Sequence, residues 1–447
     1  MPRMFGTDGV RGIANTEALS PELAFRLGRA AAAMAYEKTG RRPVAVVGRD
    51  TRRSGPMLAA AVSAGICSAG GDVVDLGVVT TPGVAFITTH LKADFGVMLS
   101  ASHNPAPDNG IKFFSAEGYK LPDEVEDQLE ALVRTTPDTM PRPTGAALGT
   151  IRTDAAAIEA YIEHLVGTGQ PLTGLKLVVD CGHGAAYQLS PEVLRRLGAE
   201  VIALNTAPDG MNINDGCGST HPEQLQQAVV AHGAHAGIAH DGDADRCIAV
   251  DERGELVDGD QIMAICALDL HARGALAGDT VVATVMSNMG LELLLKKHQI
   301  RLLKTKVGDR YVLEEMLKGQ YVLGGEQSGH VIFGQLSTTG DGILTAVQLL
   351  SVMAREKRPL SELAGQMVRL PQWLENVRVA SKEGWDRNPA IAEAIQKVQT
   401  ALGDQGRVLV RPSGTEPVIR VMLEGPDLNQ IRAMAQQIKE VIIAELS

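Results

Sequence analysis

The sequence predicts an α/β protein with three similar mixed α/β domains, whose sheets are largely parallel, plus a smaller C-terminal α+β domain. Two observations lead to this prediction. Short apolar runs alternate with helical stretches in a unit that occurs three times, which is typical of βαβ structure. The C-terminal part instead has two alternating strands around a tight loop. A length of 447 residues suits several domains, at roughly 100–200 residues each.

The repeated unit consists of an apolar run, a helical stretch and two further apolar runs. Its first copy begins with PVAVVGRD at Pro43–Asp50, continues with a helix over 55–69, and ends with GDVVDLG and DFGVMLS. The second copy begins with LKLVVDCGHG at Leu175 and ends at Arg246. The third begins with DTVVATVMSN at Asp279 and ends at His330. Continuous apolar runs of this kind are typical of buried parallel strands.

Breaks between the copies predict domains over 1–150, 151–253, 254–368 and 369–447. A Pro-rich linker, TTPDTMPRPTG, follows the first copy, and a turn-rich stretch, DERGELVDGD, follows the second. A different pattern opens near Pro371, with strands expected at RVLVRP and VIRVMLEG. A final helix is expected from Asp427, a good N-cap residue. Helical spacing predicts an apolar face on that helix, formed by Leu428, Ile431, Ala435, Ile438 and Ile442.

Composition and charge exclude several classes of protein. The formal net charge is −11 and aromatic residues make up 3%, which disfavours binding to nucleic acid or to anionic membranes. No stretch approaches the ~18 apolar residues of a membrane span, and the start shows no signal peptide. Five cysteines without a C-x-x-C pair indicate free thiols in a reducing compartment. We therefore expect a cytoplasmic protein; its oligomeric state is open, with a homodimer as one option.

A polar loop ends each copy of the unit at the same place. These loops are SASHNP, HDGDADR and GGEQSGH. Because ligands of open α/β sheets bind outside the carboxyl ends of the strands, we interpret the loops as parts of functional sites rather than as three polar surface loops.

The loop DGDADR predicts a metal site. Asp241, Asp243 and Asp245 alternate along it, and oxygen-only ligands at this spacing suit a hard cation, most simply Mg²⁺. The alternative is an acidic surface turn. Three carboxylates without an interleaved lysine repel one another unless a cation lies between them, so we favour the metal site.

The loop SASHNP allows three interpretations. Ser102 and His103 would be a hydrolase nucleophile and base, but neighbouring residues of such a loop point apart, and no G-x-S-x-G motif is present. The loop would otherwise bind phosphate passively, or Ser102 would carry a phosphoryl group. The last interpretation best explains the three aspartates, because a phosphoserine beside them requires a divalent ion that also assists phosphoryl transfer.

Two further motifs suggest substrate contacts. In RPSGTEP, the backbone N–H groups of Ser413, Gly414 and Thr415 would cradle an anion, with Arg411 and Arg420 as added donors. The alternative is an ordinary hairpin turn. In GGEQSGH, Glu326 and Ser328 would bind adjacent sugar hydroxyls, and the alternative is a capping Glu with a core histidine, His330.

Taken in order, Ser-His-Asn-Pro, Asp-Gly-Asp-Ala-Asp-Arg, Gly-Glu-Gln-Ser-Gly and Arg-Pro-Ser-Gly-Thr-Glu-Pro resemble the motifs of the α-D-phosphohexomutases. The opening FGTDGVRG is also similar to the start of that family, and the resemblance covers essentially the whole chain. It implies four domains around one central cleft. It also implies that Ser102 is a phosphoserine, with one of its oxygens completing a Mg²⁺ site formed by Asp241, Asp243 and Asp245.

The resemblance implies roles for the remaining motif residues. Glu326, Ser328 and Arg246 would contact the sugar phosphate. Arg11, Lys112 and His330 match positions that the family uses near the reacting oxygens. The residues that would hold the non-reacting phosphate are Arg411, Ser413, Gly414, Thr415 and Arg420.

Within the family, the chain resembles the branch that acts on glucosamine phosphate. Ser100, Ala244 and NDGCGSTH at Asn214–His221 are similar to that branch. The implied reaction converts glucosamine 6-phosphate to glucosamine 1-phosphate through a 1,6-bisphosphate and supplies UDP-N-acetylglucosamine synthesis. Alternatives are a glucose or mannose phosphate mutase of the same family, a Mg²⁺ phosphatase and a non-catalytic sugar-phosphate sensor. The separate phosphate loop at Arg411 argues against the phosphatase, and the aspartates beside a serine argue against the sensor.

Overall fold

The computed structural model describes residues 3–6, 8–135, 138–413 and 417–446. The chain divides into two compact units. The first comprises Met1–Val285 and Arg301–Gly365 and contains three β-sheets. The second comprises Met286–Ile300 and Gln366–Ser447 and contains the fourth sheet.

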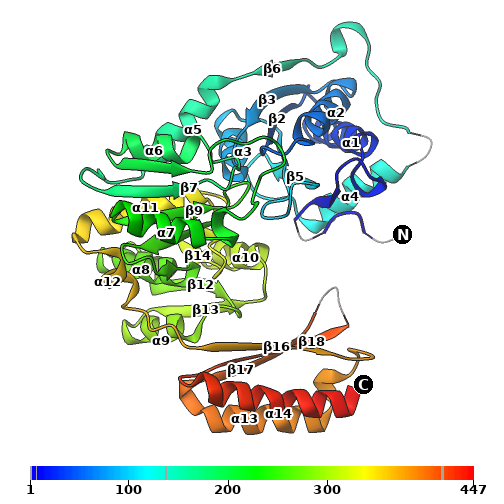
Figure 1. Ribbon diagram of the computed structural model, residues 1–447. Helices are drawn as coiled ribbons and strands as arrows, with labels where there is room; N and C mark the ends of the chain where they lie inside the picture. Colours follow the sequence, from blue (N-terminus) through cyan, green and yellow to red (C-terminus); the bar gives the residue numbers. More distant parts are fainter. Residues whose placement is uncertain (1–2, 7, 136–137, 414–416, 447) are drawn as a thin grey trace. The chain divides into compact units, whose positions relative to one another are not determined.

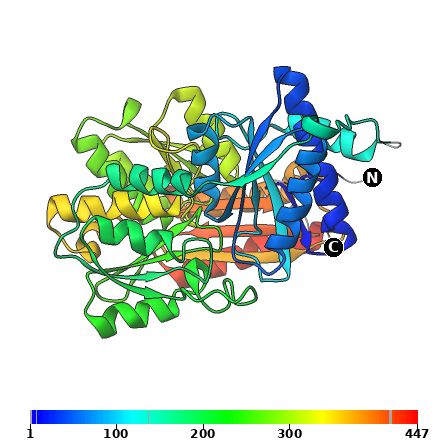
Figure 2. The same ribbon diagram turned by 90° about the horizontal axis from the view of Figure 1, so that it is seen from above.

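The first sheet has six strands in the order β1-β5-β4-β2-β3-β6. Its strands are β1 (Val10–Ile13), β2 (Val44–Arg49), β3 (Asp72–Val78), β4 (Phe95–Leu99), β5 (Asp108–Ser115) and β6 (Ile151–Thr153). Its helices are α1 (Pro21–Thr39), α2 (Gly55–Ser68), α3 (Thr81–His90) and α4 (Asp123–Arg134). Helices α1 and α2 lie side by side (Figures 1 and 2). Glycine permits this close approach, because a Cβ at Gly65 would lie 2.1 Å from the carbonyl oxygen of Phe25.

The second sheet has five strands in the order β11-β10-β9-β7-β8. Its strands are β7 (Lys176–Asp180), β8 (Glu200–Leu204), β9 (Ala236–His240), β10 (Cys247–Asp251) and β11 (Leu256–Val257). The helices of this domain are α5 (Ala155–Gly167), α6 (Leu189–Arg196) and α7 (Glu223–His232).

The third sheet has four strands in the order β13-β12-β14-β15. Its strands are β12 (Thr280–Thr284), β13 (Arg301–Thr305), β14 (Leu323–Gly325) and β15 (Val331–Phe333). The accompanying helices are α8 (Gly259–Ala272), α9 (Met289–Lys297), α10 (Asp309–Gly319), α11 (Gly342–Glu356) and α12 (Leu360–Ala364). Helix α9 groups with the second unit, where Asn288 at its N-cap donates a hydrogen bond to the carbonyl of Leu370.

The three sheets share one topology. In each, a first strand pairs in parallel with the second on one side and the third on the other, and a fourth strand pairs antiparallel with the third. Because parallel crossovers are right-handed, the two connecting helices cover opposite faces of the first sheet and of the second sheet. The predicted repeat of three strands is therefore confirmed, while the fourth, antiparallel strand of each copy was not predicted. The three polar loops all join the third strand to the fourth.

The C-terminal unit carries an antiparallel sheet in the order β16-β18-β17. Its elements are β16 (Gln372–Arg378), β17 (Arg407–Pro412), β18 (Val418–Glu424), α13 (Pro389–Leu402) and α14 (Leu428–Leu446). Asp427 accepts hydrogen bonds from the backbone N–H groups of Asn429 and Gln430, which confirms the expected N-cap. The expected apolar face is buried except at Leu428, which follows the helical spacing but is 47% exposed. This residue lies in the first helical turn, before α14 packs on the sheet.

Two expected domain limits fall next to short edge strands. Strand β6 begins at residue 151 and pairs with β3 of the first sheet, and β11 pairs with β10 of the second sheet within the stretch expected to be a turn-rich crossing. Among the residues that the structure describes, none of the helices combines the length and apolar character of a membrane span.

Candidate active site

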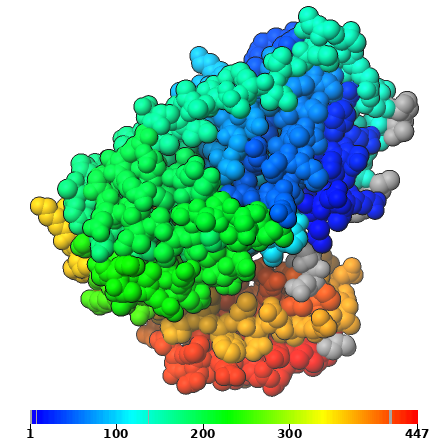
Figure 3. Space-filling model, turned by 45° about the horizontal axis from the view of Figure 1, so that its top comes forward, coloured from blue at the N-terminus to red at the C-terminus, as the bar shows by residue number. Residues whose placement is uncertain are grey.

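The loops that follow β4 and β9 meet at one point of the first unit. The hydroxyl of Ser102 donates a hydrogen bond to Asp241 Oδ2 at 2.6 Å, although the two residues are 139 positions apart. The backbone N–H of Thr81, at the start of α3, donates to the carbonyl of Asp243. The blue first domain and the green second domain form a continuous surface in Figure 3. The sequence prediction that these loops belong to one site is thus supported by their contact.

The two serines of the Ser102 loop lie in different environments. Ser100 Oγ donates to Asp50 at 2.6 Å and accepts the backbone N–H of Ser102 at 2.9 Å. Ser102 has a positive φ of 53° and is 1% exposed, and its hydroxyl faces Asp241. Only the second serine therefore presents its hydroxyl to the aspartates.

The alternative of a Ser102–His103 dyad is not supported by the geometry. The distance from Ser102 Oγ to His103 Nδ1 is 3.4 Å, longer than the 2.6 Å to Asp241. Arg246 Nη1 donates to the same ring nitrogen at 3.1 Å. Burial and the positive charges of Arg246 and Arg11 lower the pKa of His103. The nitrogen that a base would use is already occupied by a guanidinium.

A buried arginine that the sequence analysis did not single out holds the Ser102 loop in place. Arg52 forms an ion pair with Asp50 at 2.8 Å, and both side chains are fully buried. Its guanidinium donates to the carbonyl oxygens of Ser102, Asn104 and Asp108, at 2.8–3.0 Å. Five fixed donors make arginine well suited to such a role. The sequence signal was the charged stretch GRDTRRSG directly after β2.

Replacing Arg52 with methionine should lower both stability and kcat. The change leaves Asp50 buried without its cation, and breaking a buried ion pair costs roughly 3–5 kcal/mol. The loop that carries Ser102 also loses the hydrogen bonds that the guanidinium donates to its carbonyl groups, so we expect kcat to fall by at least about tenfold in the variant that remains folded. Urea unfolding and steady-state kinetics test both effects. Arg53→Met is the control, because Arg53 is exposed, and equal behaviour of the two variants would contradict this role.

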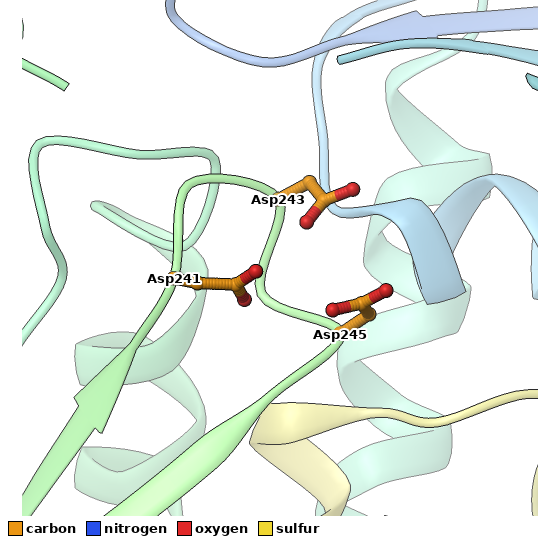
Figure 4. Close-up of side chains that lie close together, drawn as sticks. All are labelled: Asp241, Asp243 and Asp245. Carbon is orange, nitrogen blue, oxygen red and sulfur yellow. The ribbon is translucent and has the colours of Figure 1, made fainter. Parts of the chain in front are cut away.

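The three aspartates form a buried cluster on the loop between β9 and β10. Asp241, Asp243 and Asp245 each offer an oxygen, and these oxygens lie within 4.8 Å of one another. Figure 4 shows the three carboxylates converging. Burial, together with the charges of Asp245 and Asp243, raises the pKa of Asp241 to about 8. The cluster therefore holds closely spaced negative charge that a proton or a cation would relieve.

This cluster fits a divalent metal ion. Asp243 Oδ1 and Asp245 Oδ1 are buried and accept no hydrogen bond from the residues that the structure describes. Buried polar atoms without a partner are rare, and carboxylate oxygens are the ligands that hard cations prefer. The other oxygen of Asp243 accepts hydrogen bonds from Thr81 and Lys112, at 2.6 and 2.8 Å, which hold this side chain in place.

Lys112 and Arg11 lie beside the cluster. Lys112, on β5, forms ion pairs with Asp243 at 2.8 Å and with Asp8 at 2.9 Å. Burial alone would lower the pKa of Lys112, but these two carboxylates raise it above its ordinary value. Arg11, on the neighbouring strand β1, also pairs with Asp8. Lys112 thus brings a positive charge to the aspartates from the first sheet, and Arg11 shares its partner Asp8.

The loop between β14 and β15 brings His330 to the cluster. His330 Nδ1 lies 3.5 Å from Asp245, and its Nε2 lies 3.6 Å from Asp309. Glu326 Oε1 accepts a hydrogen bond from the backbone N–H of Gly308 at 3.1 Å. Because Gly308 directly precedes helix α10, this contact agrees with the alternative in which Glu326 caps a helix. Ser328 is exposed. Gly329 closes the turn with a φ of 94°, where a Cβ would lie 2.3 Å from the carbonyl oxygen of Cys247.

The C-terminal unit places the two arginines of the phosphate motif side by side. Arg411 and Arg420 are directly opposite in the register of β17 and β18, and desolvation and the charge of Arg420 lower the pKa of Arg411. Like charges at directly opposite positions of a sheet repel one another and are destabilising. An anion bound between the two arginines would relieve this repulsion. Ser413 N–H donates to Val418, and Lys382 Nζ, not singled out earlier, donates to the Ser413 carbonyl at 2.6 Å. Gly414 and Thr415 lie outside the described residues.

Comparison with known families covers nearly the whole chain. Models of the phosphoglucomutase/phosphomannomutase family match residues 2–140 as alpha/beta/alpha domain I, 159–254 as domain II, 258–370 as domain III and 374–441 as the C-terminal domain. The chain belongs to the phosphoglucomutase/phosphomannomutase family. The resemblance drawn from the four motifs is confirmed, and the protein is a phosphohexomutase, an isomerase.

Individual members of this family show the same likeness. A phosphoglucosamine mutase from Symbiobacterium thermophilum is 79% identical over 446 residues, which cover 100% of both chains. The crystal structure of a phosphoglucomutase/phosphomannomutase family protein from Burkholderia thailandensis has a TM-score of 0.80 at 26% identity, covering 98% of this chain and 96% of that one. The Aspergillus fumigatus N-acetylphosphoglucosamine mutase, solved with GlcNAc-6P and magnesium, shares the fold with a TM-score of 0.64 at 18% identity, covering 96% and 100%.

Proposed function

We propose that this phosphohexomutase interconverts glucosamine 6-phosphate and glucosamine 1-phosphate, and so supplies UDP-N-acetylglucosamine synthesis. The observation that carries the proposal is the full-length identity of 79% to a phosphoglucosamine mutase. The buried Ser102 hydroxyl, 2.6 Å from the aspartate cluster, supports a phosphoserine mechanism.

In the proposed reaction, phospho-Ser102 donates its phosphoryl group to the free hydroxyl oxygen of glucosamine 6-phosphate. The P–O bond to Ser102 Oγ breaks, a P–O bond to the sugar forms, and glucosamine 1,6-bisphosphate results. The bisphosphate turns around, and its 6-phosphoryl group passes to Ser102 Oγ, leaving glucosamine 1-phosphate. Asp241, Asp243, Asp245 and a phosphoserine oxygen would hold Mg²⁺, which would neutralise charge on the group in transfer.

Side chains around the aspartates support this transfer. Arg11 and Lys112 would place positive charge at the transferring oxygens, and the raised pKa of Lys112 favours its charged form. His330, between two carboxylates, would exchange a proton with the reacting sugar hydroxyl. Arg246 lies beside His103 and would bind the phosphoryl group of the substrate.

We assign recognition of the rest of the substrate to two further motifs. Glu326 and Ser328 would bind sugar hydroxyls. The non-reacting phosphate would be held by Arg411, Ser413, Gly414, Thr415 and Arg420. The paired arginines on β17 and β18 support an anion site there. One site for the distal phosphate serves both orientations of the bisphosphate.

The comparison of three sugars tests the substrate. We expect kcat/KM for glucosamine 6-phosphate to exceed that for glucose and mannose 6-phosphates by at least about tenfold, since a site built around a polar group rejects analogues that lack it. Each sugar is assayed with its own 1,6-bisphosphate. Equal or higher values for glucose or mannose would contradict the substrate assignment, and inorganic phosphate as the main product would indicate a phosphatase.

We also propose the division into domains over 1–150, 151–253, 254–368 and 369–447. Five free cysteines fit a cytoplasmic location, and the acidic net charge fits an enzyme that does not bind nucleic acid. Light scattering of the purified protein distinguishes a monomer from the homodimer that we keep as an option.

A further inference from the structure

An ion pair joins the first and third domains at the start of α10. Lys120 Nζ lies between Asp8 Oδ1 and Asp309 Oδ2, at 2.6 Å from each. All three side chains are about one-fifth exposed, so the pair is screened from water more than a surface pair. Lys120 follows β5 and Asp309 is the first residue of α10, 189 positions further along the chain.

Further contacts connect both sides of this ion pair to the candidate active site. On one side, Asp8 contacts Lys112, which contacts Asp243. On the other side, Asp309 contacts His330, which lies 3.5 Å from Asp245. We call this series the ion-pair chain; its members in order are Asp243, Lys112, Asp8, Lys120, Asp309, His330 and Asp245. This series of contacts therefore starts and ends at the aspartate cluster.

The turn that carries Asp309 also contacts the sugar-recognition loop. The N–H of Gly308 donates to Glu326 Oε1 at 3.1 Å. A displacement of this turn therefore moves Glu326 together with His330. The position of Asp309 is fixed relative to the first domain by its contact with Lys120.

A cavity of about 890 Å³ lies against this pair. Lys120, Asp309 and His330 line it together with apolar side chains such as Phe113, Leu313 and Ile332. A shorter or uncharged side chain at Lys120 or Asp309 would therefore meet open space on that side. Substitutions of the pair should be tolerated by the fold, because they remove the ion pair without forcing the core to repack.

We infer that Lys120 and Asp309 are positioning residues of the mutase: their ion pair sets His330 and Glu326 in register with Lys112 and Ser102. The inference rests on the proposed function. Lys120 contacts Asp8 and Asp309, and Asp309 contacts His330, so each acts through its neighbours in the ion-pair chain. Loss of the pair misplaces the groups around the sugar, and misplacement by about 1 Å costs on the order of 100-fold in rate.

Kinetics of Lys120→Met, Asp309→Asn and the double variant test the inference. We expect each single change to lower kcat for glucosamine 6-phosphate by about 10- to 100-fold while KM changes less than about threefold. The double variant should be no worse than the poorer single variant, because both changes break the same contact. Lys120→Arg, which keeps the charge, should recover part of kcat.

Arg310→Gln is the matched control. Arg310 follows Asp309 and pairs with the more exposed Asp123 of the first domain; this change should leave kcat within about twofold of the wild-type value. Single variants with wild-type kcat, or losses that multiply in the double variant, would overturn the inference. The wild-type enzyme is measured in the same assay, so inactivity on glucosamine phosphates would reject the proposed function instead.

Discussion

Replacing Ser102 with alanine is expected to lower kcat by at least about a thousandfold. The change removes the hydroxyl oxygen that is proposed to carry the phosphoryl group. Without this oxygen, neither transfer of the reaction can take place. Stability should fall by only about 0.5–1.5 kcal/mol, the usual contribution of one hydrogen bond, here the bond to Asp241. Steady-state turnover of glucosamine 6-phosphate and urea unfolding measure the two effects.

Ser100→Ala is the matched control for this prediction. Ser100 is a buried serine of the same loop, but its hydroxyl is bonded to Asp50 and to the Ser102 N–H. We expect Ser100→Ala to lose a moderate part of its activity, because the loop that carries Ser102 is held less firmly without these two hydrogen bonds. Near-normal turnover of Ser102→Ala, together with an inactive Ser100→Ala, would transfer the carrier role to Ser100.

Asp243→Asn is expected to lower activity by at least about 100-fold at a fixed, limiting Mg²⁺ concentration. The amide keeps the shape and can still accept from Thr81 and Lys112, but it removes one negative charge from the cluster. Weaker metal binding should raise the Mg²⁺ concentration for half-maximal activity by at least about tenfold. Titration of activity with Mg²⁺ and calorimetry of Mg²⁺ binding measure this change.

Asp75→Asn serves as the control for the loss of a charge. Asp75 pairs with Arg49 at 3.0 Å on the first sheet, away from the cluster. The activity of Asp75→Asn should therefore depend on Mg²⁺ in the same way as that of the wild-type enzyme. Full activity of the wild-type enzyme in excess chelator would show that the cluster is not a metal site required for turnover.

The repeated architecture could be predicted because its signals are local. Each buried parallel strand is a continuous apolar run, and each copy of the unit has the same order of runs. The edge strands β1, β6 and β11 were not predicted, since runs of two to four residues carry no clear pattern. Leu428 fits the helical spacing but is exposed, because spacing alone does not show where packing on the sheet begins.

Some residues of the candidate site could likewise be predicted from the sequence, and others could not. Ser102 and the three aspartates could be found because unusual polar residues gather at strand ends. Arg52 was missed because an arginine after a strand resembles ordinary surface charge, and its role depends on a loop about 50 positions away. Lys120 and Asp309 were missed because their pairing joins segments 189 positions apart, which no local pattern reveals.

Mass spectrometry of the phosphorylated enzyme tests the phosphoserine mechanism most directly. Purified protein is mixed with glucosamine 6-phosphate, and the intact mass, the Ser102 peptide and the released products are followed over time. The mechanism predicts one phosphoryl group on Ser102 that moves to the sugar as glucosamine 1,6-bisphosphate and returns to the enzyme. Release of that group as inorganic phosphate, or full turnover by an enzyme that never carries phosphate on Ser102, would contradict it.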